Sequence, residues 1–148
     1  MNNNSYKHLI TEVACLIGLA VQADKIHASG NLIFKNVAVT VFFNEKKSDL
    51  VHVYVDFGDF PQHKAQDIFR RLLEINLLVS SQGSPRLGLD PTTGRVIFCW
   101  SRPLADLSAQ KLLGGIDMAV TQALSWRDNF YLDDAQAPRD DMRHALHV

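Results

Sequence analysis

Apolar residues recur at helical spacing near the start of the chain. The positions that repeat every three or four residues between 5 and 20 are Tyr6, Leu9, Ile10, Val13, Leu16, Ile17 and Ala20. This period predicts a helix over residues 5–20, and Asn4 or Ser5 can cap its first turn. Gly18 and the mixed composition of 22–30 predict that a loop follows.

The hydrophobic period changes to two between residues 31 and 57. Leu32 and Phe34 share one face of a first strand, and turns at Asn36 and at 44–49 separate it from two more. The apolar positions that share a face of these later strands are Val37, Val39, Val41 and Phe43, then Val51, Val53, Val55 and Phe57. Because such short connections cannot make the crossover of a parallel pair, the pattern predicts an antiparallel meander.

The remaining pattern predicts a helix over 62–78, a hairpin over 86–100 and a last helix over 106–126. The glycines at 114 and 115 weaken that last helix by about 1 kcal/mol each relative to alanine, which predicts close packing or a kink there. The fold class is therefore α+β. An antiparallel sheet of about five strands, a β-meander plus a hairpin, packs with three α-helices in the order α-β-β-β-α-β-β-α. We expect one domain over 1–132 and a flexible polar tail over 133–148.

The helix over 62–78 is more apolar than one buried face requires. Its apolar residues cover an arc of about 200°, where a single core-facing stripe needs only about 100°. Either the helix is sandwiched within one protomer, or its second side meets another subunit, and for a domain of this size we favour a symmetric homodimer. Asn76 falls inside the apolar arc, so its amide must find hydrogen-bond partners, and we expect backbone near the helix end.

Charge and targeting signals narrow the class of protein. The net charge of −1 offers no basic field for nucleic acid. The N-terminus lacks the charged and apolar regions of a signal peptide, and no apolar run reaches the length of a membrane span. We therefore expect a protein of the cell interior that contacts neither nucleic acid nor membrane. Cys15 and Cys99 lie in separate apolar runs, which predicts two buried, reduced thiols.

No motif indicates catalysis or a bound metal. Asp56, Phe57 and Gly58 spell the metal-binding triplet of protein kinases, but no glycine-rich loop or catalytic loop accompanies it, so we interpret it as the end of a strand. The six histidines show no zinc-ligand spacing, and the serines and glycines form neither a nucleophile elbow nor a phosphate loop. We expect no enzymatic activity, no catalytic residue, no metal and no cofactor.

Residues 72–100 carry a family resemblance. The segments that carry it are Leu72-Leu73-Glu74-Ile75-Asn76-Leu77-Leu78, Leu87-Gly88-Leu89-Asp90 and Gly94-Arg95-Val96. In this order and spacing they resemble the central signature of class I type III secretion chaperones, the Tir-chaperone (CesT/SycE-like) family. The order of predicted elements agrees with that family over residues 5–126. Two features depart from it: family members are usually clearly acidic, and the segment after Leu132 has no counterpart.

The resemblance implies a homodimer in the bacterial cytoplasm that binds the N-terminal chaperone-binding segment of one or more secreted effectors. The bound segment stays extended, lays apolar side chains into grooves and adds strand-like pairing. The resemblance also makes the export ATPase of the secretion apparatus a candidate partner. Leu72, Leu73 and Leu77 map to the dimerisation helix, while Gly88 and Gly94 shape the hairpin. With the apolar arc of the same helix, the expected dimer interface comprises Ile68, Leu72, Leu73, Ile75 and Leu77.

The effector-binding surface is predicted from excess apolar residues elsewhere. The helix over 5–20 is apolar over about 160° of its circumference, which again exceeds one core face. The residues expected to contribute to an effector groove are Leu9, Val13, Leu16, Leu32, Phe34 and Phe42. The alternative for each of them is a place in the core. The alternative function is a small-ligand-binding or enzymatic α+β domain with a pocket between sheet and helix.

Overall fold

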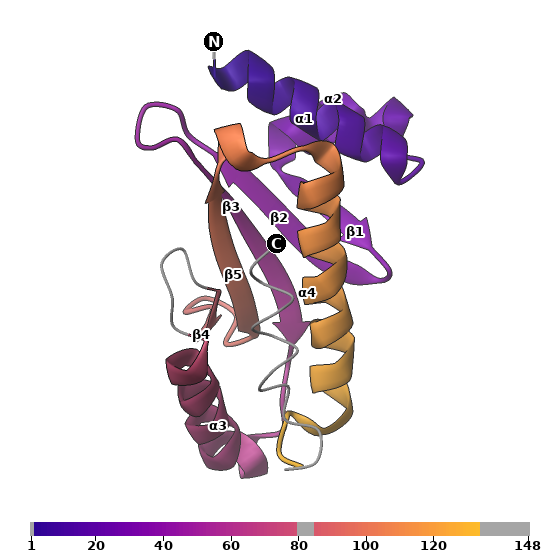
Figure 1. The fold of residues 1–148 in the computed structure, drawn as a ribbon. Coiled ribbons are helices and arrows are strands. Elements are labelled where there is room, and N and C mark those ends of the chain that lie inside the picture. The colour runs from indigo at the N-terminus through magenta and orange to yellow at the C-terminus, as the bar shows by residue number, and fades with distance from the viewer. Residues whose placement is uncertain (1, 80–84, 134–148) are drawn as a thin grey trace.

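The computed structural model describes residues 2–79 and 85–133, which form one α+β unit (Figure 1). The five strands are β1 (Asn31–Phe34), β2 (Val37–Phe43), β3 (Leu50–Gly58), β4 (Arg86–Leu89) and β5 (Val96–Pro103). The helices are α1 (Asn2–Leu16), α2 (Ala23–Ser29), α3 (Ala65–Leu78) and α4 (Ala109–Asn129). Three short 3-10 turns, η1 (Ala20–Gln22), η2 (Gln62–Lys64) and η3 (Leu104–Asp106), lie between them.

The strands form one antiparallel sheet in the order β1-β2-β3-β5-β4. The predicted meander and hairpin are both present, and the hairpin joins the meander through β5. Lys35 and Asn36 have φ angles of 50° and 63°, which are the left-handed values of a two-residue type I′ turn between β1 and β2. The expected strand end at Asp56 and Gly58 is confirmed, because β3 runs to Gly58.

One face of the sheet packs against α4, which runs along it (Figure 1). Val39, Val55 and Phe98 are paired neighbours across three strands, and each is at most 1% exposed. The close packing predicted at the paired glycines occurs at Gly115, where a Cβ would lie 2.6 Å from Cζ2 of Trp100. Helix α4 runs without interruption through both glycines, from Ala109 to Asn129.

The N-terminal prediction was wrong in two details. The first helix spans Asn2–Leu16 instead of 5–20, and the stretch expected to be a loop contains α2, so the described residues form four α-helices instead of three. The class of fold is as expected. Because α2 has seven residues and buries only Ala23 and Ile26, its apolar period is too short to recognise in the sequence. Gly30, at φ 74°, ends α2 and turns the chain directly into β1.

Helix α3 lies at the far end of the molecule from α1, beside β4 (Figure 1). It buries Ile68, Leu72 and Ile75 within the protomer, together with Arg71. The guanidinium Nε of Arg71 donates to the carbonyl oxygen of Tyr131 at 3.1 Å, which ties α3 to the chain after α4. The expected tail lies almost entirely at residues 134–148, outside the described residues, and stays a prediction.

The cysteine prediction was half wrong. Both thiols are free, but Cys15 is exposed and Cys99 is partly buried. Cys15 lies on the solvent side of α1, because the buried side of that helix is formed by Tyr6, Leu9, Ile10, Val13 and Ala14. Burial raises the pKa of the Cys99 thiol above its ordinary value.

Candidate functional site: an open strand edge beside an apolar pocket

The free edge of β1 presents unpaired backbone groups. In a two-residue hairpin, Phe34 and Val37 form a hydrogen-bonded pair, and hydrogen-bonded and non-hydrogen-bonded pairs then alternate along the strands. The bond from the Val41 N–H to the Gly30 carbonyl, at 2.7 Å, fits this alternation. The N–H and C=O of Ile33 therefore point away from β2. No other residue in 2–79 or 85–133 hydrogen-bonds them.

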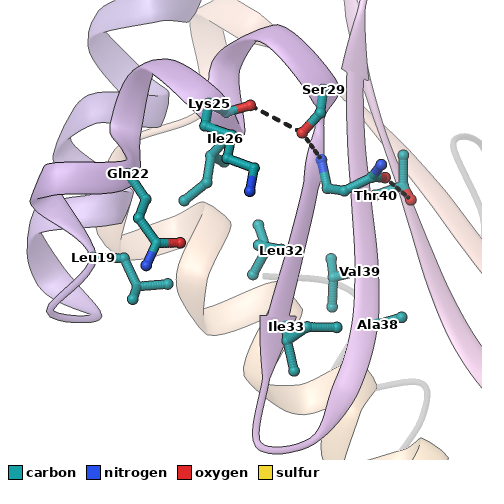
Figure 2. Close-up of a pocket in the computed structure, with 11 residues that line it drawn as sticks. Leu19, Gln22, Lys25, Ile26, Ser29, Leu32, Ile33, Ala38, Val39 and Thr40 are labelled. Carbon is teal, nitrogen blue, oxygen red and sulfur yellow. Dashed lines mark hydrogen bonds between the residues drawn. The ribbon is translucent and has the colours of Figure 1, made fainter.

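Asn31 shares the outward direction, but its N–H already has a partner. Ser29 Oγ accepts it at 3.1 Å, and the same hydroxyl donates to the Lys25 carbonyl at 2.9 Å (Figure 2). This leaves Ile33 as the residue whose donor and acceptor are both available. An extended chain that approaches β1 can form a two-bond pair with Ile33, in the manner of an added edge strand.

The opposite edge of the sheet is closed at its centre. Leu87 of β4 pairs with Phe98 at a position without backbone hydrogen bonds to β5, so its polar groups point outward. Both meet the side chain of Asn76, whose Nδ2 donates to the Leu87 carbonyl at 2.9 Å. The Leu87 N–H donates to Asn76 Oδ1 at 2.8 Å. The expected backbone partner of Asn76 is thus a neighbouring strand and not its own helix end.

A pocket of about 540 Å³ lies between α2 and the β1–β2 hairpin. Figure 2 shows Leu19, Gln22, Lys25 and Ile26 on the helix side, facing Leu32, Ile33 and Val39 on the strand side. Buried Ile26, Leu32 and Val39 give it an apolar floor, whereas Ile33 is 62% exposed at its rim. The pocket and the open backbone of Ile33 therefore adjoin one another.

The structure divides the residues predicted to bind an effector into core and surface. Leu9 and Val13 are buried in the core of the protomer, and buried Leu32 forms part of the pocket floor. Leu16 and Phe42 are 51% and 49% exposed. Phe34, from the open strand, packs partly buried against the core. Of the six, Leu32 alone lines the pocket. The prediction missed Ile33 and all of α2, although the assignment of Leu32 and Phe34 to one face already placed Ile33 on the other.

A second surface, on the side of the sheet that faces away from α4, exposes two aromatic residues. Phe42 and Tyr54 are exposed there on neighbouring strands. The ring of Phe42 lies 6.3 Å from that of His52, centroid to centroid, and His52 Nδ1 is 2.7 Å from Ser101 Oγ. Side-chain contacts on this face therefore run across three strands, from Phe42 of β2 through His52 of β3 to Ser101 of β5. Phe42 belongs to this surface and not to the pocket beside α2.

The expected dimer residues also separate into two groups. Ile68, Leu72 and Ile75 lie inside the protomer and do not reach its surface. Leu73 and Leu77, which are i and i+4 on α3, are 70% and 79% exposed. The second apolar side that the sequence predicted for this helix is therefore real, and it consists of these two leucines.

The polar clusters of the described residues hold strands and helices together. Asp56 forms an ion pair with Arg95 at 2.9 Å, which explains the acidic residue of the kinase-like triplet. Arg127 donates to the carbonyl oxygens of Phe57 and Asp56 at 2.7 and 2.9 Å and so anchors α4 to the end of β3. No group of three His, Cys, Asp or Glu side chains within 2–79 and 85–133 could hold a metal ion. No helix in these ranges is long and apolar enough to cross a membrane.

Three solved structures of similar fold are complexes of two proteins, and two of them are described as containing a chaperone. A chain of the HopA1–SchA chaperone–effector complex matches with a TM-score of 0.65 and 23% identity, over 86% of this chain and 97% of that one. A chain of the ExsC–ExsE complex matches with a TM-score of 0.65 and 15% identity, over 86% and 95%. The Yersinia pestis type III secretion chaperone SycH with a fragment of YscM2 matches with a TM-score of 0.55 and 20% identity, over 81% and 98%.

Comparison with curated protein sequences gives no match. A family model, in contrast, matches residues 8–127, which is most of the chain. That range begins within α1 and ends within α4, so it takes in the complete sheet, the open edge of β1 and helix α3. The chain belongs to the Tir chaperone protein (CesT) family.

Proposed function

We propose that this protein is a type III secretion chaperone that binds the N-terminal chaperone-binding segment of one or more effectors in extended form. The family match and the fold support this function, and both are those of non-enzymatic chaperones. The single observation that carries the mechanism is the open edge at Ile33 beside an apolar pocket. Such an edge offers main-chain hydrogen bonds, while the pocket takes a side chain of the added strand.

The binding step follows from this geometry. An effector segment pairs with β1 at Ile33 and directs alternate side chains toward the pocket. Burial of apolar surface, at about 25 cal/mol per Å², offsets the entropy that the segment loses on ordering. The exposed Leu16 and Phe42 and the partly buried Phe34 extend the contact beyond the pocket. Leu32 contacts the bound side chain from the pocket floor, whereas Leu9 and Val13 act indirectly, as the buried support beneath this surface.

A homodimer joined through α3 is part of the proposal. Leu73 and Leu77 form an exposed apolar strip on the helix that the family uses for dimerisation, and a symmetric dimer would bury it against its own copy. Helix α3 lies at the end of the molecule opposite α1 (Figure 1). Two protomers joined there leave both β1 edges free. One long effector segment can then reach both edges in the bacterial cytoplasm, before transfer to the export ATPase.

The test removes the outward backbone N–H of Ile33 and leaves the residues of the hydrophobic core unchanged. Ile33→Pro eliminates the outward N–H, and proline is tolerated on an edge strand where that group has no ladder bond. The control is Ile33→Val, which keeps the N–H. We expect the proline variant to lose affinity for the effector segment that co-purifies from the native cell, while the valine variant retains it. Equal affinity of two folded variants would contradict strand addition at β1.

A further inference from the structure

The pocket beside α2 contains one charged side chain. Of the residues that line it, only Lys25 carries a charge, and the others are apolar or neutral polar. Lys25 lies on the helix wall, opposite Leu32 and Val39 (Figure 2). Its Nζ forms no ion pair with any acid in the described ranges, whereas Lys7 pairs with Asp24 at 3.9 Å and Lys35 pairs with Asp117 at 2.6 Å.

The acid next to Lys25 in the sequence does not neutralise it. Asp24 is paired with Lys7 of α1 at 3.9 Å and does not line the pocket. Ser29 Oγ, which also lines the pocket, donates to the Lys25 carbonyl and accepts from Asn31 N–H. The pocket therefore presents an apolar floor with an unneutralised positive charge at its wall.

We propose that Lys25 makes this pocket selective for an apolar anchor residue with an Asp or Glu two positions away. Side chains two apart share one face of a strand, so an anchor that enters the pocket brings its second neighbour to the same side. A carboxylate there can pair with Lys25, and a lysine or arginine there meets like charge. The inference rests on the proposed function, since it names the chemistry of the segment that adds to β1.

The probe is a random peptide library displayed on phage and selected separately on wild-type protein and on Lys25→Glu. A matched control is Lys47→Glu, an exposed lysine in the turn between β2 and β3, outside the pocket. For wild type and Lys47→Glu we expect peptides with an apolar residue and an acid two positions away. A surface ion pair changes a binding constant by up to about fivefold. We therefore expect peptides with the acid to be enriched over peptides without it by about that factor in each round of selection. Lys25→Glu should instead enrich Lys or Arg at that position.

The possible outcomes distinguish a failure of the proposed role of Lys25 from a failure of the proposed binding of extended segments. Apolar peptides selected with the same charge preference by wild type and Lys25→Glu would overturn the role of Lys25 and leave binding of extended segments intact. Failure of both proteins to enrich any apolar peptide would overturn both. Inversion by Lys47→Glu as well as Lys25→Glu would show that overall charge, and not the pocket, sets the preference, and so would also overturn the proposal.

Discussion

The side-chain amide of Asn76 and the backbone of Leu87 form a closed pair of hydrogen bonds, at 2.9 and 2.8 Å, that joins α3 to the edge of the sheet. The amide supplies one donor and one acceptor with the spacing that a peptide group would supply in a further strand. It satisfies the polar groups of β4 at the point where that strand could otherwise accept a partner chain. Asn76 therefore closes the β4 edge at Leu87, whereas the β1 edge is open at Ile33.

Replacing Asn76 should therefore weaken the protomer. Asn76→Leu leaves the N–H and C=O of Leu87 without their partners, and we expect the free energy of unfolding to fall by about 1–3 kcal/mol. Chemical denaturation measures the change. Gln66→Leu, at an exposed position of the same helix, is the control and should leave the free energy of unfolding nearly unchanged. Equal effects of the two substitutions would show that the pair does not stabilise the protein.

The two sides of α3 should respond differently to charge. Leu73→Glu places a carboxylate on a side chain that is 70% exposed in the protomer, so we expect a folded monomer. Leu72→Asp instead buries an unpaired charge at a position that is 5% exposed, and it should unfold or aggregate the protein. Light scattering and circular dichroism distinguish the two results. A wild-type protein that is monomeric at micromolar concentration would rule out the dimer.

The adjacent glycines of α4 provide a matched pair of substitutions. Gly115→Ala places a methyl group 2.6 Å from the Trp100 ring, and the overpacking should cost about 1–3 kcal/mol of unfolding free energy. Gly114 has no atom within 4 Å of its added Cβ, so Gly114→Ala should stabilise the protein by up to about 1 kcal/mol. Thermal unfolding of both variants checks the sign. Destabilisation by both would mean that helix geometry, and not Trp100, requires glycine.

Effector binding should depend on apolar contact more than on salt. We expect Leu16→Glu, Phe34→Glu and Phe42→Glu to fold and to lose affinity for the effector segment, since each places charge on an apolar surface. Titration calorimetry at low and high salt measures the affinities. The matched control is Val21→Glu, a fully exposed residue of η1. If the first three folded variants all bind like wild type, the groove lies elsewhere on the molecule.

The segment beyond residue 133 should contribute little to stability. Tyr131 is 1% exposed, and its hydroxyl donates to Gln122 Oε1 at 2.6 Å, so the domain must include it. Deleting 134–148 leaves this contact in place, and we expect the melting temperature to change by no more than about 2 °C. Calorimetry of the shortened chain tests this. A large decrease would reveal a docked C-terminal element.

Local periodicity was sufficient for much of this fold. Valines at every second position over 37–41 and again over 51–55, and leucines at helical spacing from 72 to 78, set the type of each element. Side-chain direction repeats with a period of two in a strand and 3.6 in a helix. Short connections then required antiparallel neighbours. The sequence segments around Leu72 and Gly88, which resemble the type III secretion chaperone family, indicated the class of function.

Tertiary structure decided which apolar residues remain accessible. Leu9 and Leu16 belong to the same predicted helix, yet Leu9 is buried and Leu16, the last residue of α1, is half exposed, while Val13 and Ala14 of the same final turn are buried. A repeat in the sequence shows which residues share a face, but it does not show what lies opposite that face. The same limit applies to the site. The edge at Ile33 is open because β1 is last in the sheet, whereas Asn76 closes the other edge at Leu87, and both facts depend on segments far apart in the chain.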